Sequence, residues 1–387
     1  MKNILLTSTA LVAFAGAAFA DSNGVSFAGD ATLGFNDALE ADGGEDGFYW
    51  DVNVAVTMAT TLDNGLTATA AFNIEIDDEG AQGDLNGLNN DYGLASSSYV
   101  LSLTSESASL YFGDVAFAAE TQWKSAGDME ADAFSEADGE VALRGDMTMA
   151  GVSASVSMVI ADANGNYVSD SAESVDQLSL GVSGDLGMFS FSAAYQEESK
   201  FMGAGNGDFE NAEAFGISGG VTVAGADVTV AYAQRSELGA ADELNSLGVK
   251  VAYPFGPVTA TVYYVAEDTQ NSGDADDNYG LQLDYAQGPF TGLLKVRSEG
   301  EINTAATETE WNIEGSYDLG NGLTVLAGAL NENEGDDADF YVGGTYDLGG
   351  GATILAMFAE DKDGDQGDEI GSGEYMPGTT VEVGFTF

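Results

Sequence analysis

Carboxylates supply almost all of the charged groups that this sequence could use for chemistry. The chain has 65 Asp and Glu residues against nine Lys and Arg, and it has neither His nor Cys. Without an imidazole or a thiol, His-assisted serine hydrolysis, Cys nucleophiles and His-ligated zinc sites are excluded, and only carboxylate catalysis remains open. Nucleic acid is excluded as a partner because phosphate binding needs clustered Lys and Arg. We expect no enzyme, no cofactor, and an electrostatic role for the charges.

The few basic residues lie mostly in segments where apolar and polar residues alternate. A period of two indicates a β-strand whose two faces meet different surroundings. Five basic residues fall on the polar face of such segments: Arg144, Arg235, Lys250, Lys295 and Arg297. They are candidates for a basic wall on a wet inner surface that faces acidic groups. The alternative is that each one pairs with a nearby carboxylate on the same face.

The longest connection, from about Ala118 to Glu140, concentrates acid. It contains a single basic residue, Lys124, among seven carboxylates. These carboxylates are Glu120, Asp128, Glu130, Asp132, Glu136, Asp138 and Glu140. By composition alone it could be an ordinary solvated loop, since residues 36–47 are also acidic. Its length and position favour a functional loop.

Another acidic segment has the alternating carboxylates of a calcium loop, at Asp361, Asp363 and Asp365. An EF-hand requires Gly at the sixth position and Glu at the twelfth. This segment has Gln366 and Ser372 there. We expect no metal site, and loop-bound calcium is only an alternative.

Very short connections and long connections alternate between the successive segments. Nine of them are tight, at Asp63–Gly65, Ser105–Ser107, Ala150–Gly151, Asp185–Gly187, Ala224–Gly225, Pro254–Pro257, Gln287–Pro289, Gly320–Gly322 and Gly349–Gly351. A transmembrane β-barrel has short turns at its periplasmic rim and long loops outside, whereas a soluble sandwich has no reason to sort its connections. Nine turns at the rim that also holds both chain ends predict twenty strands. Sixteen to eighteen stays open, and an even number is expected.

The alternation also predicts which residues face lipid. The clearest strand is Val152–Ile160, and similar segments are Leu66–Ile76, Val221–Val230, Leu247–Tyr253, Trp311–Leu319, Phe340–Leu348 and Val381–Phe387. A lipid-facing Lys or Arg near mid-membrane costs about 2–4 kcal/mol, which favours an inward orientation for the five basic residues. Aromatic residues flank the tight turns, at Phe189, Tyr253, Phe290, Tyr317 and Tyr346. They predict an interfacial girdle, unless they reflect strand propensity alone.

The N-terminal residues 1–20 have the pattern of a secretory signal peptide. Lys2 supplies the positive charge, Ile4 to Ala15 the apolar core and Ala18-Phe19-Ala20 the cleavage site. No other apolar run approaches the length of a membrane helix. With only four prolines and no linker, residues 21–387 are predicted to form a single β-barrel domain.

Three segments resemble the general diffusion porins of the Gram-negative outer membrane, of the acidic alphaproteobacterial type. Val381–Phe387 alternates and ends on Phe, as in the assembly signal of these barrels. Tyr341–Phe358 and Ala108–Asp114 are also similar to them, the latter to the strand that precedes their constriction loop. The resemblance implies that the acidic connection folds into the pore and that three copies form a homotrimer. Porins of this family typically have about sixteen strands, fewer than the turns predict here.

These observations lead to an expected function. We expect an outer-membrane channel for passive diffusion of small hydrophilic solutes and ions, with a preference for cations because acid dominates. Its surroundings would be outer-membrane lipid and lipopolysaccharide. The alternatives are a substrate-selective channel, for which the sequence shows no aromatic track or binding motif, and a secreted calcium-binding acidic β-protein, which would need short glycine-rich repeats.

Overall fold

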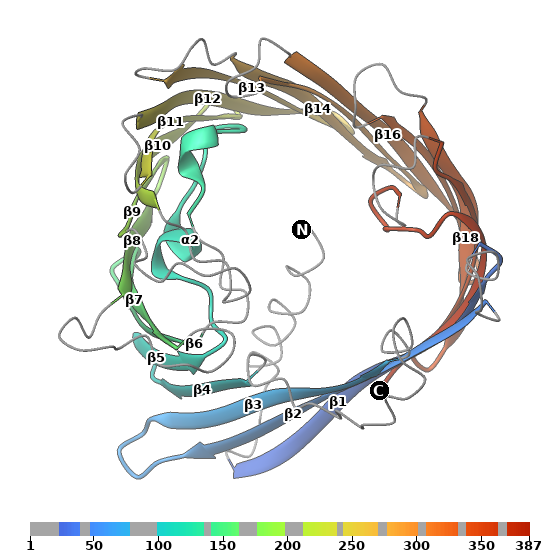
Figure 1. Ribbon diagram of the computed structural model, residues 1–387, viewed down its shortest axis with the longest axis horizontal. Coiled ribbons are helices and arrows are strands. Elements are labelled where there is room, and N and C mark those ends of the chain that lie inside the picture. Colours follow the sequence, from blue (N-terminus) through green and yellow to red (C-terminus); the bar gives the residue numbers. More distant parts are fainter. Residues whose placement is uncertain are drawn as a thin grey trace.

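A single closed ring of antiparallel strands forms the body of the protein (Figure 1). The computed structural model describes residues 23–38, 47–77, 99–134, 141–161, 176–197, 212–237, 243–269, 277–300, 307–331, 338–362 and 370–387. Within these ranges there are twenty strands, each hydrogen-bonded to the next in the chain. The last strand pairs with the first, from Asp30 opposite Thr386 to Asn36 opposite Thr380, and closes the ring. The predicted count of twenty is confirmed.

The first ten strands are β1 (Asn23–Asn36), β2 (Phe48–Thr61), β3 (Thr67–Asp77), β4 (Tyr99–Thr104), β5 (Ala108–Gly113), β6 (Val141–Met149), β7 (Val152–Ala161), β8 (Asp176–Leu186), β9 (Phe189–Gln196) and β10 (Ala212–Val223). The others are β11 (Ala226–Glu237), β12 (Glu243–Phe255), β13 (Val258–Thr269), β14 (Asn278–Gln287), β15 (Phe290–Gly300), β16 (Thr307–Gly320), β17 (Leu323–Asn331), β18 (Asp339–Gly349), β19 (Ala352–Glu360) and β20 (Gly378–Thr386). Two short helices, α2 (Ala118–Gln122) and η4 (Glu130–Asp132), lie between β5 and β6.

All nine predicted tight turns join consecutive strands at one rim. In the turn between β6 and β7, Ala150 and Gly151 both have positive φ, at 53° and 82°. This is the backbone of a type I′ turn, whose twist matches that of the flanking strands. One strand prediction is wrong, because Val221–Val230 spans two strands: the turn at Ala224-Gly225 ends β10 and begins β11.

The outer face of the ring is apolar. Val230, Leu247, Val249, Ile313 and Val342 are 42–52% exposed although they lie in mid-strand. Such a band needs lipid around it, because a contiguous apolar surface of this kind is rare in water. Among the described residues, no helix is long and apolar enough to cross a membrane. The predicted girdle residues next to the turns are likewise exposed: Phe189, Tyr253, Phe290, Tyr317 and Tyr346.

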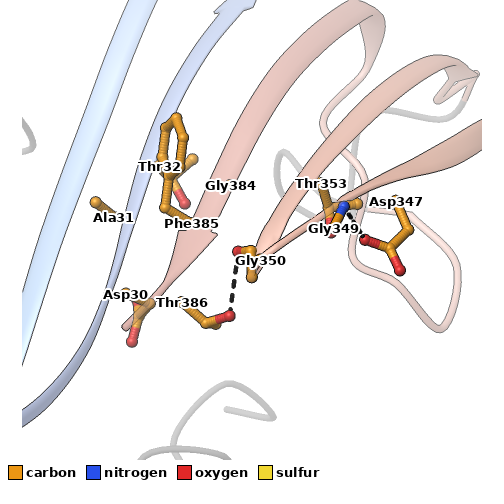
Figure 2. A pocket seen from close by; sticks show the side chains of 11 residues that line it. Asp30, Ala31, Thr32, Asp347, Gly349, Gly350, Thr353, Gly384, Phe385 and Thr386 are labelled. Carbon is orange, nitrogen blue, oxygen red and sulfur yellow. Dashed lines mark hydrogen bonds between the residues drawn. The ribbon is translucent and has the colours of Figure 1, made fainter.

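The C-terminal strand is held on both sides at the turn rim (Figure 2). Thr386 donates its backbone N–H to Gly351 O at 2.7 Å, and its hydroxyl donates to the same oxygen at 3.1 Å. Gly351 has φ +86°, and a Cβ there would lie 2.3 Å from Thr386 O. Asp30 and Asp347 line the adjoining hollow of about 480 Å³. The strand that resembles an assembly signal therefore completes the ring.

Candidate functional site

The chain between β5 and β6 enters the ring and lies along its inner wall (Figure 1). We call the described part of this connection, residues 114–134, the inner loop. Its helix α2 contacts β7, β8 and β9, and η4 contacts β10, β11 and β12. The described connection begins at Asp114, slightly earlier than the predicted Ala118. The inner loop thus covers one side of the wall.

Hydroxyl groups of the wall hold the start of helix α2. The first N–H groups of a helix have no acceptor within the helix. Here Ala118 N–H donates to Ser157 Oγ at 2.9 Å, and Ala119 N–H donates to Ser179 Oγ at 2.8 Å. All four residues are buried. The serines of β7 and β8 therefore replace the side-chain cap that α2 lacks.

The amide of Gln122 links the end of α2 to the same two strands. Its Nε2 donates to Ser155 Oγ at 2.9 Å, and Ser183 Oγ donates to its Oε1 at 2.6 Å. The backbone comes very close to the wall, since a Cβ at Gly181 would lie 2.2 Å from Ala118 O. Any side chain at this position would push the helix into the lumen.

The tip of the inner loop is held by a polar and an apolar contact. Ala131 N–H donates to Ser246 Oγ at 2.9 Å, and Glu130 N–H donates to Glu267 Oε1 at 3.1 Å. Ala126, Met129 and Ala131 pack with Ala231, Ala233 and Val265 of the wall. The tip is therefore docked rather than suspended in the lumen.

Arg144 on β6 holds the beginning of the inner loop. Its Nη1 donates to Ala116 O at 2.7 Å and to Thr121 Oγ1 at 3.2 Å. Its Nε pairs with Asp146 at 3.2 Å, and its guanidinium lies 4.9 Å from the ring centroid of Tyr111. Arg144 is only 9% exposed. It acts here as a fastening for the loop.

Arg297 on β15 performs the same task at the loop tip. Its Nε and Nη2 form a bidentate pair with Glu310 on β16. Its Nη1 donates to Asp128 Oδ2 at 3.1 Å. Asn278 Nδ2 also donates to Asp128 O at 3.2 Å. The inner loop is therefore tied to the wall from β6 to β15.

The other three predicted basic residues lie on inner-face positions. Arg235 has the same phase on β11 as Ala231 and Ala233, which pack against the loop. Lys250 on β12 interacts electrostatically with Asp132. Lys295 is exposed, two residues before Arg297 on the same face of β15.

Burial of the loop tip changes the acidity of its carboxyl groups. Burial raises the pKa of Asp132 to about 6, although Trp123 Nε1 donates to its Oδ2 at 2.8 Å. Burial also raises the pKa of Glu130 above its usual range. The charge on the loop tip therefore varies with pH below neutrality.

Four of the seven predicted loop acids lie within the described inner loop: Glu120, Asp128, Glu130 and Asp132. Glu136, Asp138 and Glu140 lie outside the described residues. Lys124 pairs with Asp185 at 3.5 Å, but both side chains are largely exposed, so this pair contributes little. Arg144 pairs with Asp146 on its own strand, the local pairing of the alternative interpretation, whereas Arg297 pairs both with Glu310 on the neighbouring strand and with Asp128 of the loop.

The sequence interpretation missed the serines that hold the loop. By alternation, Ser155 and Ser157 fall on the polar face of the segment Val152–Ile160, which predicts contact with water, but they are 6% and 1% exposed because the inner loop covers them. Ser179 and Ser246 are fully buried in the same way. The sequence signal for this contact was the repeated serine on the inner face of β7. A wall that faces only water does not require the same residue type at each inward position.

Within the part of the chain that the structure describes, no group of three or more Asp or Glu residues could hold a metal ion. The calcium-like segment falls largely on residues 363–369, which lie outside the described residues. The predicted signal peptide, residues 1–20, lies outside them as well.

A family model for Gram-negative porins matches residues 7–331, that is, as far as the end of β17. No curated protein matches the chain. Similar solved structures include a triple mutant of the Rhodopseudomonas blastica porin, 16% identical with a TM-score of 0.47, and a second mutant of that porin, 17% identical with a TM-score of 0.46. In both comparisons the match covers 94% of this chain and 100% of that chain.

Proposed function

The chain belongs to the Gram-negative porin family, and we propose that its lumen is a water-filled path for small hydrophilic solutes that favours cations over anions. Membership of this family makes it a channel for passive diffusion in the outer membrane of a Gram-negative bacterium. The apolar outer face suits contact with outer-membrane lipid and lipopolysaccharide. A homotrimer belongs to the proposal on the basis of the family resemblance, and native mass spectrometry in detergent would test it.

The distribution of charge around the wall supports the cation preference. Strands β1–β5 and β16–β20 contain no Lys or Arg. Their inner face nevertheless carries carboxylates, among them Asp30, Glu314 and Glu382. All the strand-borne basic residues are on β6, β11, β12 and β15, the side that the inner loop covers.

Two of the five basic residues on the loop side form ion pairs with neighbouring acids. Arg144 pairs with Asp146, and Arg297 pairs with both Glu310 and Asp128. The side of the lumen away from the inner loop therefore presents uncompensated negative charge. Such a surface concentrates cations in a water-filled path and repels anions. This asymmetry is the observation that carries the proposal.

Liposome swelling tests the channel function. The purified protein, reconstituted into liposomes, should admit neutral sugars at rates that fall smoothly with solute size and rise linearly with concentration. Absence of swelling with the smallest sugar would contradict the proposal. A saturating rate for one sugar would instead favour the substrate-selective alternative.

A further inference from the structure

A second segment enters the ring on the side opposite the inner loop. Residues 370–377, which we call the folded-in segment, precede β20 and lie beside β18 inside the barrel (Figure 1). Ile370 and Tyr375 exchange two backbone hydrogen bonds at 2.9 Å, and Glu374 N–H donates to Gly371 O at 3.0 Å. Gly371 has φ +78°, which permits this tight turn.

Apolar contacts hold the folded-in segment against the wall. Ile370 is 1% exposed and packs with Leu330, Tyr341, Met357 and Ala359. These residues are on the inner faces of β17, β18 and β19, where a purely solvated lumen would have polar groups. The segment therefore has a built seat in the wall.

Two tyrosine rings form a corner at this seat. The rings of Tyr341 and Tyr375 have centroids 5.0 Å apart and are tilted by 48°. Tyr341 is fixed between two glycines, because a Cβ at Gly328 or at Gly371 would lie within 2.4 Å of its ring. The ring position is therefore set by close backbone packing on both sides.

A carboxylate with neutral partners lies at the edge of this corner. Glu314 accepts hydrogen bonds from the hydroxyls of Tyr341 and Ser372, and from Asn312 Nδ2 at 2.7 Å. None of these donors carries a charge, and strands β16–β20 contain no Lys or Arg. Its negative charge is therefore oriented by hydrogen bonds but not neutralised by a basic side chain.

A hollow of about 420 Å³ connects these groups. Its lining includes Glu314, Tyr341, Tyr375, Leu326 and a second carboxylate, Asp284. Asp284 accepts hydrogen bonds only from a neutral amide, Gln282 Nε2, at 2.9 and 3.0 Å. The hollow thus combines aromatic faces, an aliphatic floor and two carboxylates.

We propose that this hollow is a binding site for small organic cations that carry an aromatic or aliphatic group beside the charge. Aromatic faces attract organic ammonium groups, and the carboxylates add directed negative charge. The aliphatic side chains remove the apolar part of such a molecule from water. Anions would meet two carboxylates there. The inference rests on the proposed function, because the ligand reaches the hollow through the lumen.

Current block in a planar bilayer tests the site, with benzyltrimethylammonium as the probe. We expect a saturable reduction of the potassium current by this probe and a much smaller one by tetramethylammonium or benzyl alcohol. Glu314→Gln and, separately, Tyr375→Leu should weaken the block by about tenfold or more. Because two variants are measured separately, the site can still be tested if one of them fails to assemble.

Glu382→Gln is the matched control. Glu382 also lies on the inner face and accepts a hydrogen bond from a tyrosine, Tyr49, at 2.8 Å. It lacks the second ring and the folded-in segment, so the block should weaken far less than in Glu314→Gln. Equal block in all variants, or none in the native channel, would overturn the inference while leaving the channel function intact. Absence of any current would overturn both.

Discussion

Within the described part of the chain, two segments inside the ring differ in the interactions that mainly hold them. Serine hydroxyls accept the backbone N–H groups of the inner loop at Ala118, Ala119 and Ala131. The folded-in segment is instead seated by Ile370 among apolar side chains. We call the serine hydrogen bonds the polar fastening and the site of Ile370 the apolar fastening, although the tip of the inner loop also has apolar contacts.

The two segments also lie against parts of the wall that differ in charge. The inner loop lies against strands that bear basic residues, of which Arg297 pairs with Asp128 of the loop and Arg144 pairs with Asp146 on its own strand. The folded-in segment lies against strands without any Lys or Arg, so the charge of Glu314 stays uncompensated. One side of the wall therefore holds a docked loop, and the other is the side to which the proposed function assigns the attraction of cations.

The largest effect should come from removal of the polar fastening. Ser157→Ala combined with Ser179→Ala would leave the first two N–H groups of α2 buried without an acceptor, at about 1–3 kcal/mol each. Hydrogen exchange of residues 114–124 should become faster, while that of residues 370–377 stays unchanged. Ser153→Ala is the matched control, because Ser153 lies on the same face of β7 but bonds only Thr148. Equal exchange in both variants would contradict the fastening.

The apolar fastening should respond to truncation of one side chain. Ile370→Ala leaves a cavity among Leu330, Tyr341 and Met357 and should weaken the seat by about 2–5 kcal/mol. Exchange in residues 370–377 should then rise, without change in the inner loop. Ile354→Ala, on the outer face of β19, serves as control. If exchange in the inner loop rose equally, the two segments would not be independent.

A smaller effect should separate tethering from charge on β15. Arg297→Glu and Lys295→Glu change the net charge equally, and both should raise cation preference. Only Arg297→Glu breaks the partly buried pairs with Glu310 and Asp128, worth about 1.5–3 kcal/mol for a charged hydrogen bond. We expect faster exchange in residues 125–134 for Arg297→Glu alone. Faster exchange in both variants would show that the positive charge on β15, and not the specific pairs of Arg297, holds the loop in place.

The smallest effect should follow pH at the loop tip. Asp132 has a pKa of about 6 when docked, against its ordinary value of 3.8. The docked loop then binds the proton more tightly, so docking strengthens as pH falls through about 6 and the gain is complete below 3.8. Asp128 and Glu130 on the loop, Lys250 on β12 and Glu267 on β13 face this group.

Protonation of Asp132 also removes one negative charge, so cation preference should fall slightly as pH falls from about 7 to about 5. Asp132→Asn should abolish the part of this change that is centred near 6. A pH response that is identical in Asp132→Asn would assign it to other carboxyl groups.

The sequence predicted the strands of the wall far better than the inner loop and the folded-in segment that lie against them. Tight turns such as Ala150-Gly151 need special backbone conformations and so have visible residue signatures. Alternation then gave each residue a face, which placed Arg144 and Arg297 inside. Only where a strand ran into a turn without a break in alternation, at Ala224-Gly225, did the pattern mislead.

Contacts between distant segments leave no periodic signal. The sequence pattern around Ser157 is the same whether its hydroxyl bonds water or accepts the backbone N–H of Ala118. Tyr341 resembles an ordinary strand aromatic, and its neighbour Tyr375 lies across a long connection. The positions of the inner loop and of the folded-in segment depend on where each connection folds, and the alternation of the wall strands does not determine that.

The reversal potential in a potassium chloride gradient tests the central claim most directly, namely that uncompensated carboxylates govern the lumen. With the native channel in a planar bilayer, the dilute side should become positive, because potassium crosses more readily than chloride. The potential should shrink as total salt rises from about 0.1 M to about 1 M, since the screening length falls from about 10 Å to about 3 Å. A negative dilute side, which means a preference for chloride, would contradict the account.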